Sequence, residues 1–208
     1  MENFSANLSF KNKLYNLQII DVCGSDNYRE MRTMAYPDAH LFIICFSVVS
    51  PVSFQNVLTK WIPEVIMHNP YSKILLLGTQ NDLRENEKVL EELQKSGKQP
   101  ISVEKGVHLA KKIKSEGYME CSSMDCSTLY PVFEFVAKCF SQDNSKNCVL
   151  KSFKSWNWDL CKNPLFQSAV APHFCRRRKR IHQNAEKKAK LHQTKLLIYF
   201  TKKCFPLV

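Results

Sequence analysis

Residues 75–83 read Leu-Leu-Leu-Gly-Thr-Gln-Asn-Asp-Leu, and this stretch decides the fold. An apolar strand over residues 74–77 ends in a glycine, and Thr79, Gln80 and Asp82 follow it. In open α/β sheets, ligands bind beyond the carboxyl ends of the strands. A carboxylate held there suits a base with two adjacent N–H donors, such as guanine, because a charge-assisted, two-point contact is strong and selective. The alternative is an ordinary Asx-type turn, and the rest of the chain decides between the two.

The charge of the chain is unevenly distributed. The 208 residues carry a net charge of +11, and an apolar fraction of 44% is sufficient for a core. Residues 1–140 hold 15 Lys and Arg against 16 Asp and Glu, a net charge of −1, whereas residues 141–208 hold 15 against 3, a net charge of +12. This division predicts a folded domain over residues 1–140 and a basic, flexible tail over residues 141–208 that meets anionic lipid or nucleic acid.

Cysteine usage and hydropathy point to the cytosol. The nine cysteines form no Cys-x-x-Cys pair, and residues 1–10 lack the features of a signal peptide. The longest apolar run, residues 41–49, is much shorter than the ~20 residues that a membrane span needs. We therefore expect reduced thiols in a cytosolic protein.

Strand and helix signals alternate from residue 39 onward, which predicts an α/β domain with a mainly parallel sheet. Before that point, residues 7–10 and 14–20 predict a hairpin, and residues 27–37 an irregular polar segment. The later strands are expected at residues 41–46, 74–77 and 118–121, and the helices at 51–68, 85–95, 102–114 and 129–140. In a parallel sheet, the loops at Asp21, Thr79 and Ser122 would share one edge.

The second strand of the hairpin ends in Asp21-Val22-Cys23-Gly24. Asp-x-x-Gly after a strand is typical of the phosphate side of a nucleotide site, where the Asp can hold a water on Mg²⁺ and the glycine N–H can face a terminal phosphate. The same pattern ends many ordinary strands, because Asp and Gly both favour turns.

In this order, the motifs of residues 1–140 resemble the Rho branch of small GTPases. Asp21-Val22-Cys23-Gly24 is similar to the family's Asp-x-x-Gly, Thr79-Gln80-Asn81-Asp82 to its guanine motif with Gln in place of Lys, and Glu120-Cys121-Ser122-Ser123 to its Glu-Cys-Ser-Ala. Residues 36–37, 45–54 and 60–65 match characteristic Rho stretches, and residues 85–95 fall where Rho proteins carry an insert helix. Gln80 and, more weakly, residues 151–158 are most similar to the atypical Wrch/Chp-type members.

The resemblance implies a P-loop NTPase-type small G domain, with three layers around a mainly parallel sheet. Such a protein binds GTP or GDP with Mg²⁺ and acts as a switch in small GTPase-mediated signalling, regulating the actin cytoskeleton and cell shape. The implied partners are Rho-type effectors, exchange factors and activating proteins. Asp82 would bind the guanine edge, Gln80 would pack on the ring and Thr79 would brace the loop. The complete set of implied nucleotide-binding residues is Asp21 (near Mg²⁺, through a water), Gly24, Thr79, Gln80, Asp82, Ser122 and Ser123.

The phosphate-binding loop of the family is missing. None of the glycines at positions 24, 78, 97, 106 and 117 fits Gly-x-x-x-x-Gly-Lys-Ser/Thr. We therefore expect the first strand and helix to be absent, and most phosphate affinity with them. Absence of that strand leaves two apolar strand edges unpaired, near Asp21 and Ser47. Either the two flanking strands close up, or the protein is longer than this chain, which would then come from an incomplete gene model.

Ser25 stands where the family has its water-orienting glutamine, and a serine is too short for that task. No catalytic residue is therefore intact, and hydrolysis is expected to be poor. The alternative function is a nucleotide-poor pseudo-GTPase that serves as a protein-interaction module.

The tail carries a dense basic cluster, Cys-Arg-Arg-Arg-Lys-Arg, at residues 175–180. Such a cluster is typical of a solvated, disordered arm, of a nuclear import signal or of an RNA-binding segment. It could also bind anionic lipid, with a binding free energy of ~1 kcal/mol per basic residue. By analogy with Rho tails we place lipid first, and expect a cytoplasmic protein with peripheral association to the plasma membrane or endomembranes. Prenylation requires a cysteine fourth from the end and Cys204 is fifth, so Cys161, Cys175 and Cys204 are candidates for palmitoylation instead. The apolar residues 196–200 suit either a membrane interface or a short buried segment.

Overall fold

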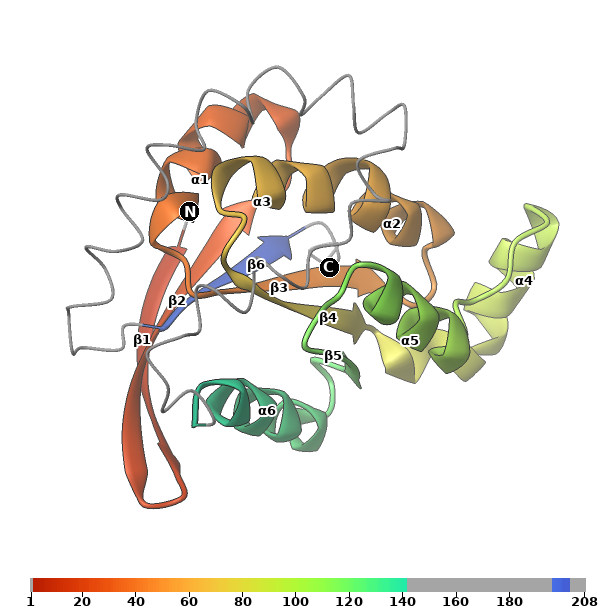
Figure 1. The fold of residues 1–208 in the computed structure, drawn as a ribbon. Helices are drawn as coiled ribbons and strands as arrows, with labels where there is room; N and C mark the ends of the chain where they lie inside the picture. The colour runs from red at the N-terminus through yellow and green to blue at the C-terminus, as the bar shows by residue number, and fades with distance from the viewer. Residues whose placement is uncertain (1, 142–195, 203–208) are drawn as a thin grey trace.

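The computed structural model describes residues 2–141 and 196–202, which form one sheet with helices on both faces (Figure 1). The strands are β1 (Glu2–Phe10), β2 (Lys13–Cys23), β3 (Leu41–Ser47), β4 (Lys73–Thr79), β5 (Gly117–Cys121) and β6 (Leu196–Lys202). The α-helices are α1 (Arg29–Ala35), α2 (Pro51–Asn56), α3 (Ile62–His68), α4 (Glu87–Lys95), α5 (Val103–Lys112) and α6 (Tyr130–Ser141). Short turns of 3-10 helix cover Asp26–Tyr28, Tyr36–Asp38, Asn81–Glu85 and Cys126–Thr128, and a π turn over Val57–Trp61 joins α2 to α3. The predicted α/β fold is confirmed.

The strands lie in the order β1-β2-β6-β3-β4-β5. Only β1 and β2 run antiparallel, and every other pair of neighbours is parallel, as predicted. The β1–β2 hairpin closes between Phe10 and Lys13, and the two turn residues Lys11 and Asn12 both have a positive φ, of 49° and 59°. A turn with two left-handed residues matches the twist of the strands that it joins.

The strand between β2 and β3 comes from the far end of the chain. We expected β2 and β3 to close up, or a further strand to come from outside this chain; instead β6 pairs in parallel with both. The sequence analysis placed residues 196–202 in the tail, whereas the structure includes them in the sheet (Figure 1). The division into a domain and a tail near residue 140 otherwise stays a prediction.

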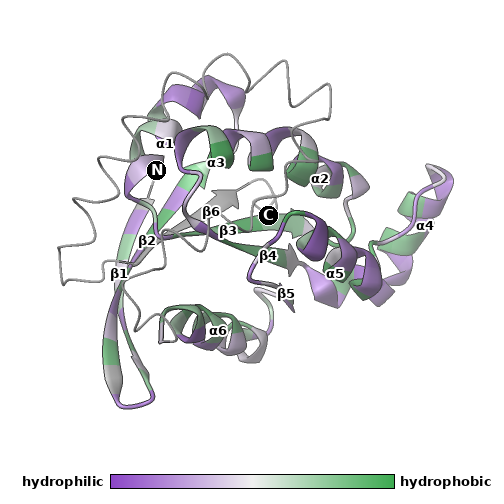
Figure 2. Cartoon of the chain, in the orientation of Figure 1, coloured by the Kyte–Doolittle hydropathy of each residue, from purple (hydrophilic) through white to green (hydrophobic). Residues whose placement is uncertain are grey.

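The sheet is buried on both faces, as the apolar run in β3 predicted. Alternate side chains of a strand point to opposite faces. Phe42, Ile44 and Phe46 belong to the cluster formed with α3 and α5, whereas Leu41 and Ile43 belong to the cluster formed with α6. Figure 2 shows β3 and β4 as largely apolar strands and α4 with both polar and apolar residues. The described part of the chain therefore has three layers.

Capping residues start the helices where the sequence predicted. Ser50 accepts a hydrogen bond from the Ser53 amide at the start of α2, and Ser102 accepts one from the Lys105 amide at the start of α5. Helix α4 ends before Gly97, whose φ of 64° is the left-handed conformation that a glycine adopts without steric cost. No helix in residues 2–141 is both long enough and apolar enough to cross a membrane.

The prediction of an irregular segment over residues 27–37 is wrong, because α1 occupies most of it. This helix buries Arg32 rather than an apolar side chain. A search for hydrophobic periodicity does not detect a helix whose inward face is charged.

Candidate functional site

The candidate site lies at the carboxyl edge of the sheet. Thr79 is in register with Ser47 of β3 on one side and with Cys121 of β5 on the other, so these three strands end level. The turn after β4 and the loop after β5 are therefore neighbours. Asp21, on β2, is separated from them by β6 and β3. The structure thus brings together the expected base-binding residues, and holds the expected phosphate-side residues apart from them.

Thr79 joins the ends of β3 and β4. Its buried hydroxyl donates to the carbonyl of Phe46 at 3.1 Å, and its own carbonyl accepts from the Val48 amide at 3.0 Å. Gln80 follows in the left-handed conformation, with φ 60° and ψ 37°, and its carbonyl accepts from the Leu83 amide at 3.1 Å. This turn leaves Asp82 exposed. Thr79 therefore joins the two strand ends, and the turn presents an accessible carboxylate at position 82.

Arg84 holds this turn in place, a contact that the sequence analysis missed. Its guanidinium donates to both carboxylate oxygens of Glu120 on β5, at 2.7 and 2.5 Å, and to the carbonyl of Ile101 at 3.1 Å. Tyr118 also donates its hydroxyl to Glu120. Burial, together with the hydrogen bond and the charge of Glu120, raises the pKa of Tyr118 well above its ordinary value, so the phenol remains a donor. A bidentate Arg–carboxylate pair of this kind fixes orientation as well as adding stability.

The loop after β5 is organised by Ser122. This residue is buried, its amide donates to the Thr128 hydroxyl at 2.9 Å, and its own hydroxyl accepts from the Met124 amide at 3.0 Å. Asp125 then accepts from the Ser127 amide and caps the short 3-10 turn. Ser123 is exposed beside it. Both serines therefore lie where a loop supporting a base would be, with Ser122 fixing its shape.

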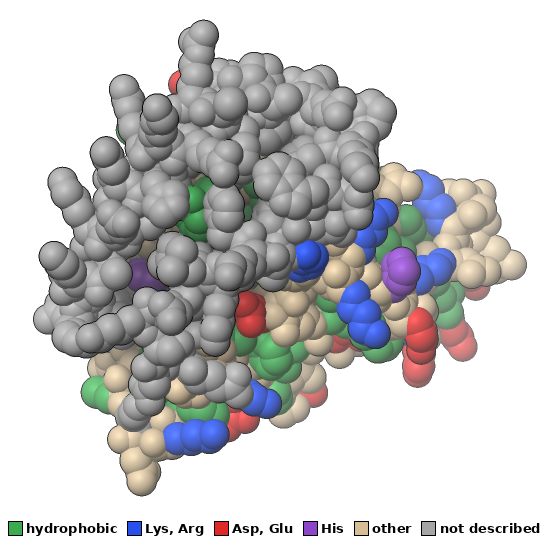
Figure 3. Space-filling view, in the orientation of Figure 1, with side chains coloured by type: hydrophobic (Ala, Val, Ile, Leu, Met, Phe, Trp, Pro, Cys, Tyr) green, Lys and Arg blue, Asp and Glu red, His purple; other side chains and the backbone are tan. Residues whose placement is uncertain are grey.

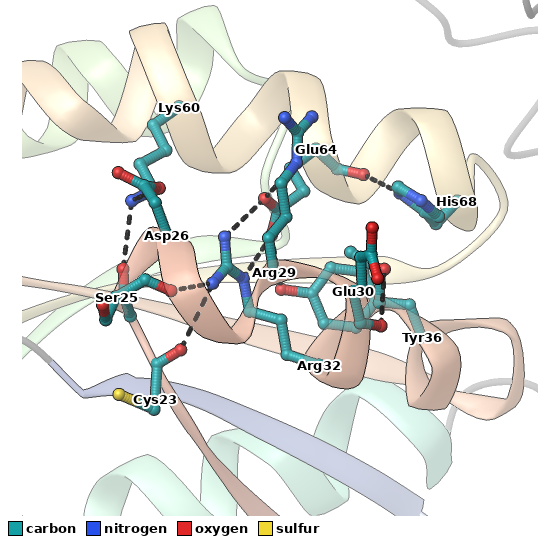
Figure 4. A network of polar contacts seen from close by, with 12 residues as sticks. Cys23, Ser25, Asp26, Arg29, Glu30, Arg32, Tyr36, Lys60, Glu64 and His68 are labelled. Carbon is teal, nitrogen blue, oxygen red and sulfur yellow. Dashed lines mark hydrogen bonds and ion pairs between the residues drawn. The ribbon is translucent and has the colours of Figure 1, made fainter.

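The Asp-x-x-Gly segment is tied to α3 and to the π turn before it (Figure 4). The buried Gly24 accepts from the Lys60 ammonium at 3.0 Å through its carbonyl, and Lys60 also pairs with the Asp26 carboxylate at 2.5 Å. Arg32 donates to the carbonyls of Ser25 at 2.5 Å and of Cys23 at 3.4 Å. The backbone carbonyls of all three residues from 23 to 25 therefore already have a partner within the chain.

Arg32 and Glu64 form the centre of this arrangement. Their side chains are 1% and 4% exposed and are joined by two hydrogen bonds, of 2.8 and 2.7 Å. Tyr36 donates its hydroxyl to Glu64 at 2.9 Å, and Arg29 approaches the same carboxylate at 3.4 Å. Burial and the charge of Glu64 raise the pKa of Tyr36 well above its ordinary value. We call these four residues the Arg32–Glu64 network.

A hollow of about 220 Å³ lies beside this network, between the start of α1 with its preceding 3-10 turn on one side and the π turn with α3 on the other. Its lining mixes charged and apolar side chains: Asp26, Arg29, Thr59, Lys60, Pro63, Glu64 and Met67. The network forms one wall of it, through Arg29 and Glu64.

The described residues are suited to bind the base of a nucleotide but not its phosphates. The turn at residues 79–82, beside Ser122, offers a carboxylate and polar side chains for a base. For phosphates, no described strand is followed by Gly-x-x-x-x-Gly-Lys-Ser/Thr, and β6 ends in Thr201-Lys202. Within the described ranges, no group of three or more His, Cys, Asp and Glu side chains could hold a metal ion, so Asp21 would be a single carboxylate toward Mg²⁺. Ser25 contributes a backbone carbonyl to Arg32.

The candidate lipidation sites, Cys161, Cys175 and Cys204, lie outside the described residues. The five cysteines of residues 2–141 are free thiols, and three of them are buried: the five are Cys23, Cys45, Cys121, Cys126 and Cys139.

Comparison with protein families agrees with the motifs at this edge. A family model described as the Ras family matches residues 1–142, which is more than half of the chain. Members of that family bind GTP or GDP, typically with Mg²⁺. The match covers the hairpin, the Asp-x-x-Gly segment, the turn after β4 and the loop after β5. This chain therefore belongs to the Ras family of small GTPases.

Proposed function

We propose that this small GTPase-like signalling protein is of the Rho type, and that it recognises the guanine base with the turn after β4. One observation carries the proposal: the exposed carboxylate of Asp82 stands on a turn that Arg84 and Glu120 hold against β5, next to the Ser122 loop. A carboxylate fixed in this way can accept from two adjacent N–H donors of the base without reorganising.

Helix α4 supports assignment to the Rho branch. It lies between the base-side turn and α5, begins at the Asn86 cap, and buries none of its residues. In Figure 3, basic and acidic side chains are interspersed over the region of α4 and α5, as expected for a solvated surface helix. An inserted, solvated helix at this place is the feature that distinguishes the Rho branch in the resemblance stated above.

Nucleotide selectivity tests the proposal. We expect GDP and GTP to bind weakly, because the phosphate side lacks its loop, but to bind more tightly than ADP and ATP. Asp82→Ala should abolish that preference, since each lost hydrogen bond to a charged group costs about 1.5–3 kcal/mol, or roughly a tenfold to hundredfold change in affinity. Calorimetry or ligand-observed NMR at millimolar nucleotide measures the difference.

Glu85→Ala is the matched control, because Glu85 is exposed on the same 3-10 turn. This variant should retain the preference for guanine. Equal binding of GDP and ADP to the unmutated protein would show that residues 79–82 form only a turn.

A second candidate function is the interaction module without a nucleotide-driven switch. Lys60 and Arg32 occupy the carbonyls of residues 23–25, which are part of the segment that would respond to a terminal phosphate. Hydrogen exchange distinguishes the two functions: protection of residues 24–36 should change on adding GTP if the protein switches, and should remain unchanged if it is a module. In both cases the partners that we propose are Rho-type effectors and regulators.

We further propose that the protein is cytoplasmic and associates peripherally with anionic membranes. The support is the charge of +12 on residues 141–208 and the basic cluster at residues 175–180, and this cluster lies outside the described residues. A role in regulating the cytoskeleton rests on the Rho assignment alone.

A further inference from the structure

Residues from the other end of the chain lie in the gap between β2 and β3, where they pair with residues 17–23 of β2 and with residues 41–43 of β3. Strand β6 is in register with β2 from Leu17↔Leu196 to Cys23↔Lys202. On its other side it is in register with β3 from Leu41↔Ile198 to Ile43↔Phe200. It is therefore an interior strand, with a parallel neighbour on both sides.

The gap has the properties of a peptide-binding site. Strand β2 pairs with β1 on its outer side, and β3 pairs with β4 on its outer side. Among the described strands, only β6 pairs with the backbone groups that β2 and β3 direct into the gap. The side chains of Leu17 and Val22 on β2 and of Leu41 on β3 are buried. Buried backbone N–H and C=O groups require partners, and an extended peptide between two strands supplies them on both sides.

The sequence of β6 suits this position. Leu-Leu-Ile-Tyr-Phe at residues 196–200 is apolar and includes β-branched and aromatic residues, which favour strands. Residues 196–205 contain neither proline nor glycine, the residues that interior strands exclude. Lys202 is the last residue of the strand, and the sequence continues with a second lysine at position 203.

We propose that the gap between β2 and β3 is a binding site for an extended apolar peptide, and that the chain's own residues 196–202 are its ligand, bound in cis. Insertion completes the sheet at the position that the phosphate-loop strand occupies in the resemblance. The proposal does not depend on nucleotide binding, because every contact that carries it is a strand pairing.

Cross-linking in the full chain tests the register and the source of the strand. Cys23 has an exposed thiol and pairs with Lys202. In Lys202→Cys with Cys204→Ser, mild oxidation should form a disulfide between Cys23 and position 202, within a monomer. The control is Thr201→Cys with Cys204→Ser, which moves the thiol by one residue and so to the opposite face of the strand. Mass spectrometry of the digested protein identifies the linked peptides.

We expect cross-linking to be at least tenfold faster in the Lys202→Cys chain than in the control. Equal rates would overturn the proposed pairing. A disulfide that joins two chains would overturn binding in cis, and would show that a second copy donates the strand.

A proline variant tests whether the site binds peptide. Ile198 is in register with both Ile19 and Leu41, and proline at this position removes a backbone N–H from an interior strand. Ile198→Pro should lower Tm by about 5–10 °C, whereas Ile198→Val, which keeps the N–H and the branched side chain, should change it little.

A synthetic peptide of residues 194–204, added to Ile198→Pro, should restore most of the lost Tm. The same peptide carrying proline at position 198 should restore none. An unchanged Tm in Ile198→Pro, or no restoration by the unmodified peptide, would overturn the proposal. If the variant does not fold, the yield of soluble protein on refolding is compared with and without the peptide. A higher yield with the unmodified peptide would support the proposal, and an equal yield would overturn it.

Discussion

Neutralising Glu64 tests whether the Arg32–Glu64 network holds the Asp-x-x-Gly segment to α3. Glu64→Gln keeps the size of the side chain but removes its charge. It also replaces one of the two oxygens that accept from Arg32 with an NH2 group, which is itself a donor. Arg32 is 1% exposed, so its guanidinium cannot turn to solvent in the folded state. The variant therefore leaves a buried cation whose acceptors within the described residues are one amide oxygen and the carbonyls of Cys23 and Ser25.

The expected loss of stability follows from this geometry. Removing one partner of a buried ion pair costs about 3–5 kcal/mol. The carbonyl contacts of Arg32 remain, which places the expected loss near the lower end, at about 3 kcal/mol. For a chain of this size, each kcal/mol shifts Tm by about 2–4 °C, so we expect Tm to fall by roughly 6–12 °C.

Urea denaturation and hydrogen exchange of residues 24–36 measure the effect. The matched control is Glu30→Gln, an exposed carboxylate on α1, which should change the free energy of unfolding by less than about 0.5 kcal/mol. Arg32→Met combined with Glu64→Gln should cost less than the sum of the two single variants, because each change removes the partner of the other. A loss below about 1 kcal/mol for Glu64→Gln, with unchanged exchange, would refute the reasoning.

Three further predictions concern catalysis, the tail and a thiol. Because Ser25 replaces the water-orienting glutamine and the phosphate loop is missing, phosphate release from GTP should not exceed the buffer rate, with or without an activating protein; stimulated release would contradict this. Residues 141–208 fused to a fluorescent protein should bind anionic vesicles at low salt and dissociate near 1 M, where the screening length is ~3 Å; salt-independent binding, or RNA co-purification without vesicle binding, would count against a lipid partner. Burial raises the pKa of Cys121 to about 11, so roughly one thiol in a thousand is ionised at pH 8. Maleimide should therefore label the exposed Cys23 well before Cys121, and equal labelling rates in the native protein would show that Cys121 is accessible.

Local signals in the sequence were sufficient for most elements of the fold. Ser50 and Ser102 cap the helices that they were expected to start, since capping depends on a hydroxyl and an amide three residues apart. The apolar run at residues 41–46 predicted a strand buried on both faces. The turn at residues 79–82 was likewise predicted at the end of β4, because a strand, a glycine and polar turn residues are contiguous in the sequence. Its role in binding a base stays a prediction.

Contacts between charged residues that are far apart in the chain could not be predicted from local sequence signals. Arg32 turns α1 inward to meet Glu64, 32 residues further on, and Arg84 meets Glu120 across 36 residues. From the sequence alone, an isolated Arg or Glu is most simply interpreted as a solvated side chain. Burial of the charge requires a partner, and only the fold brings that partner close. The two contacts that fix the candidate site therefore became visible only in the structure.

The origin of β6 shows the same limit for the backbone. The motif order predicted that a strand is missing next to β2, and in the resemblance this strand precedes the hairpin in the chain. Hydrogen bonding between strands depends on the position of the backbone in space and not on chain order, so any extended apolar segment of sufficient length that reaches the gap can fill it. Residues 196–200 were recognised as apolar, but the sequence left open whether a membrane or the protein buries them. Pairing with β2 and β3 favours the protein, because the interior of a sheet satisfies backbone groups that a membrane interface would leave to water.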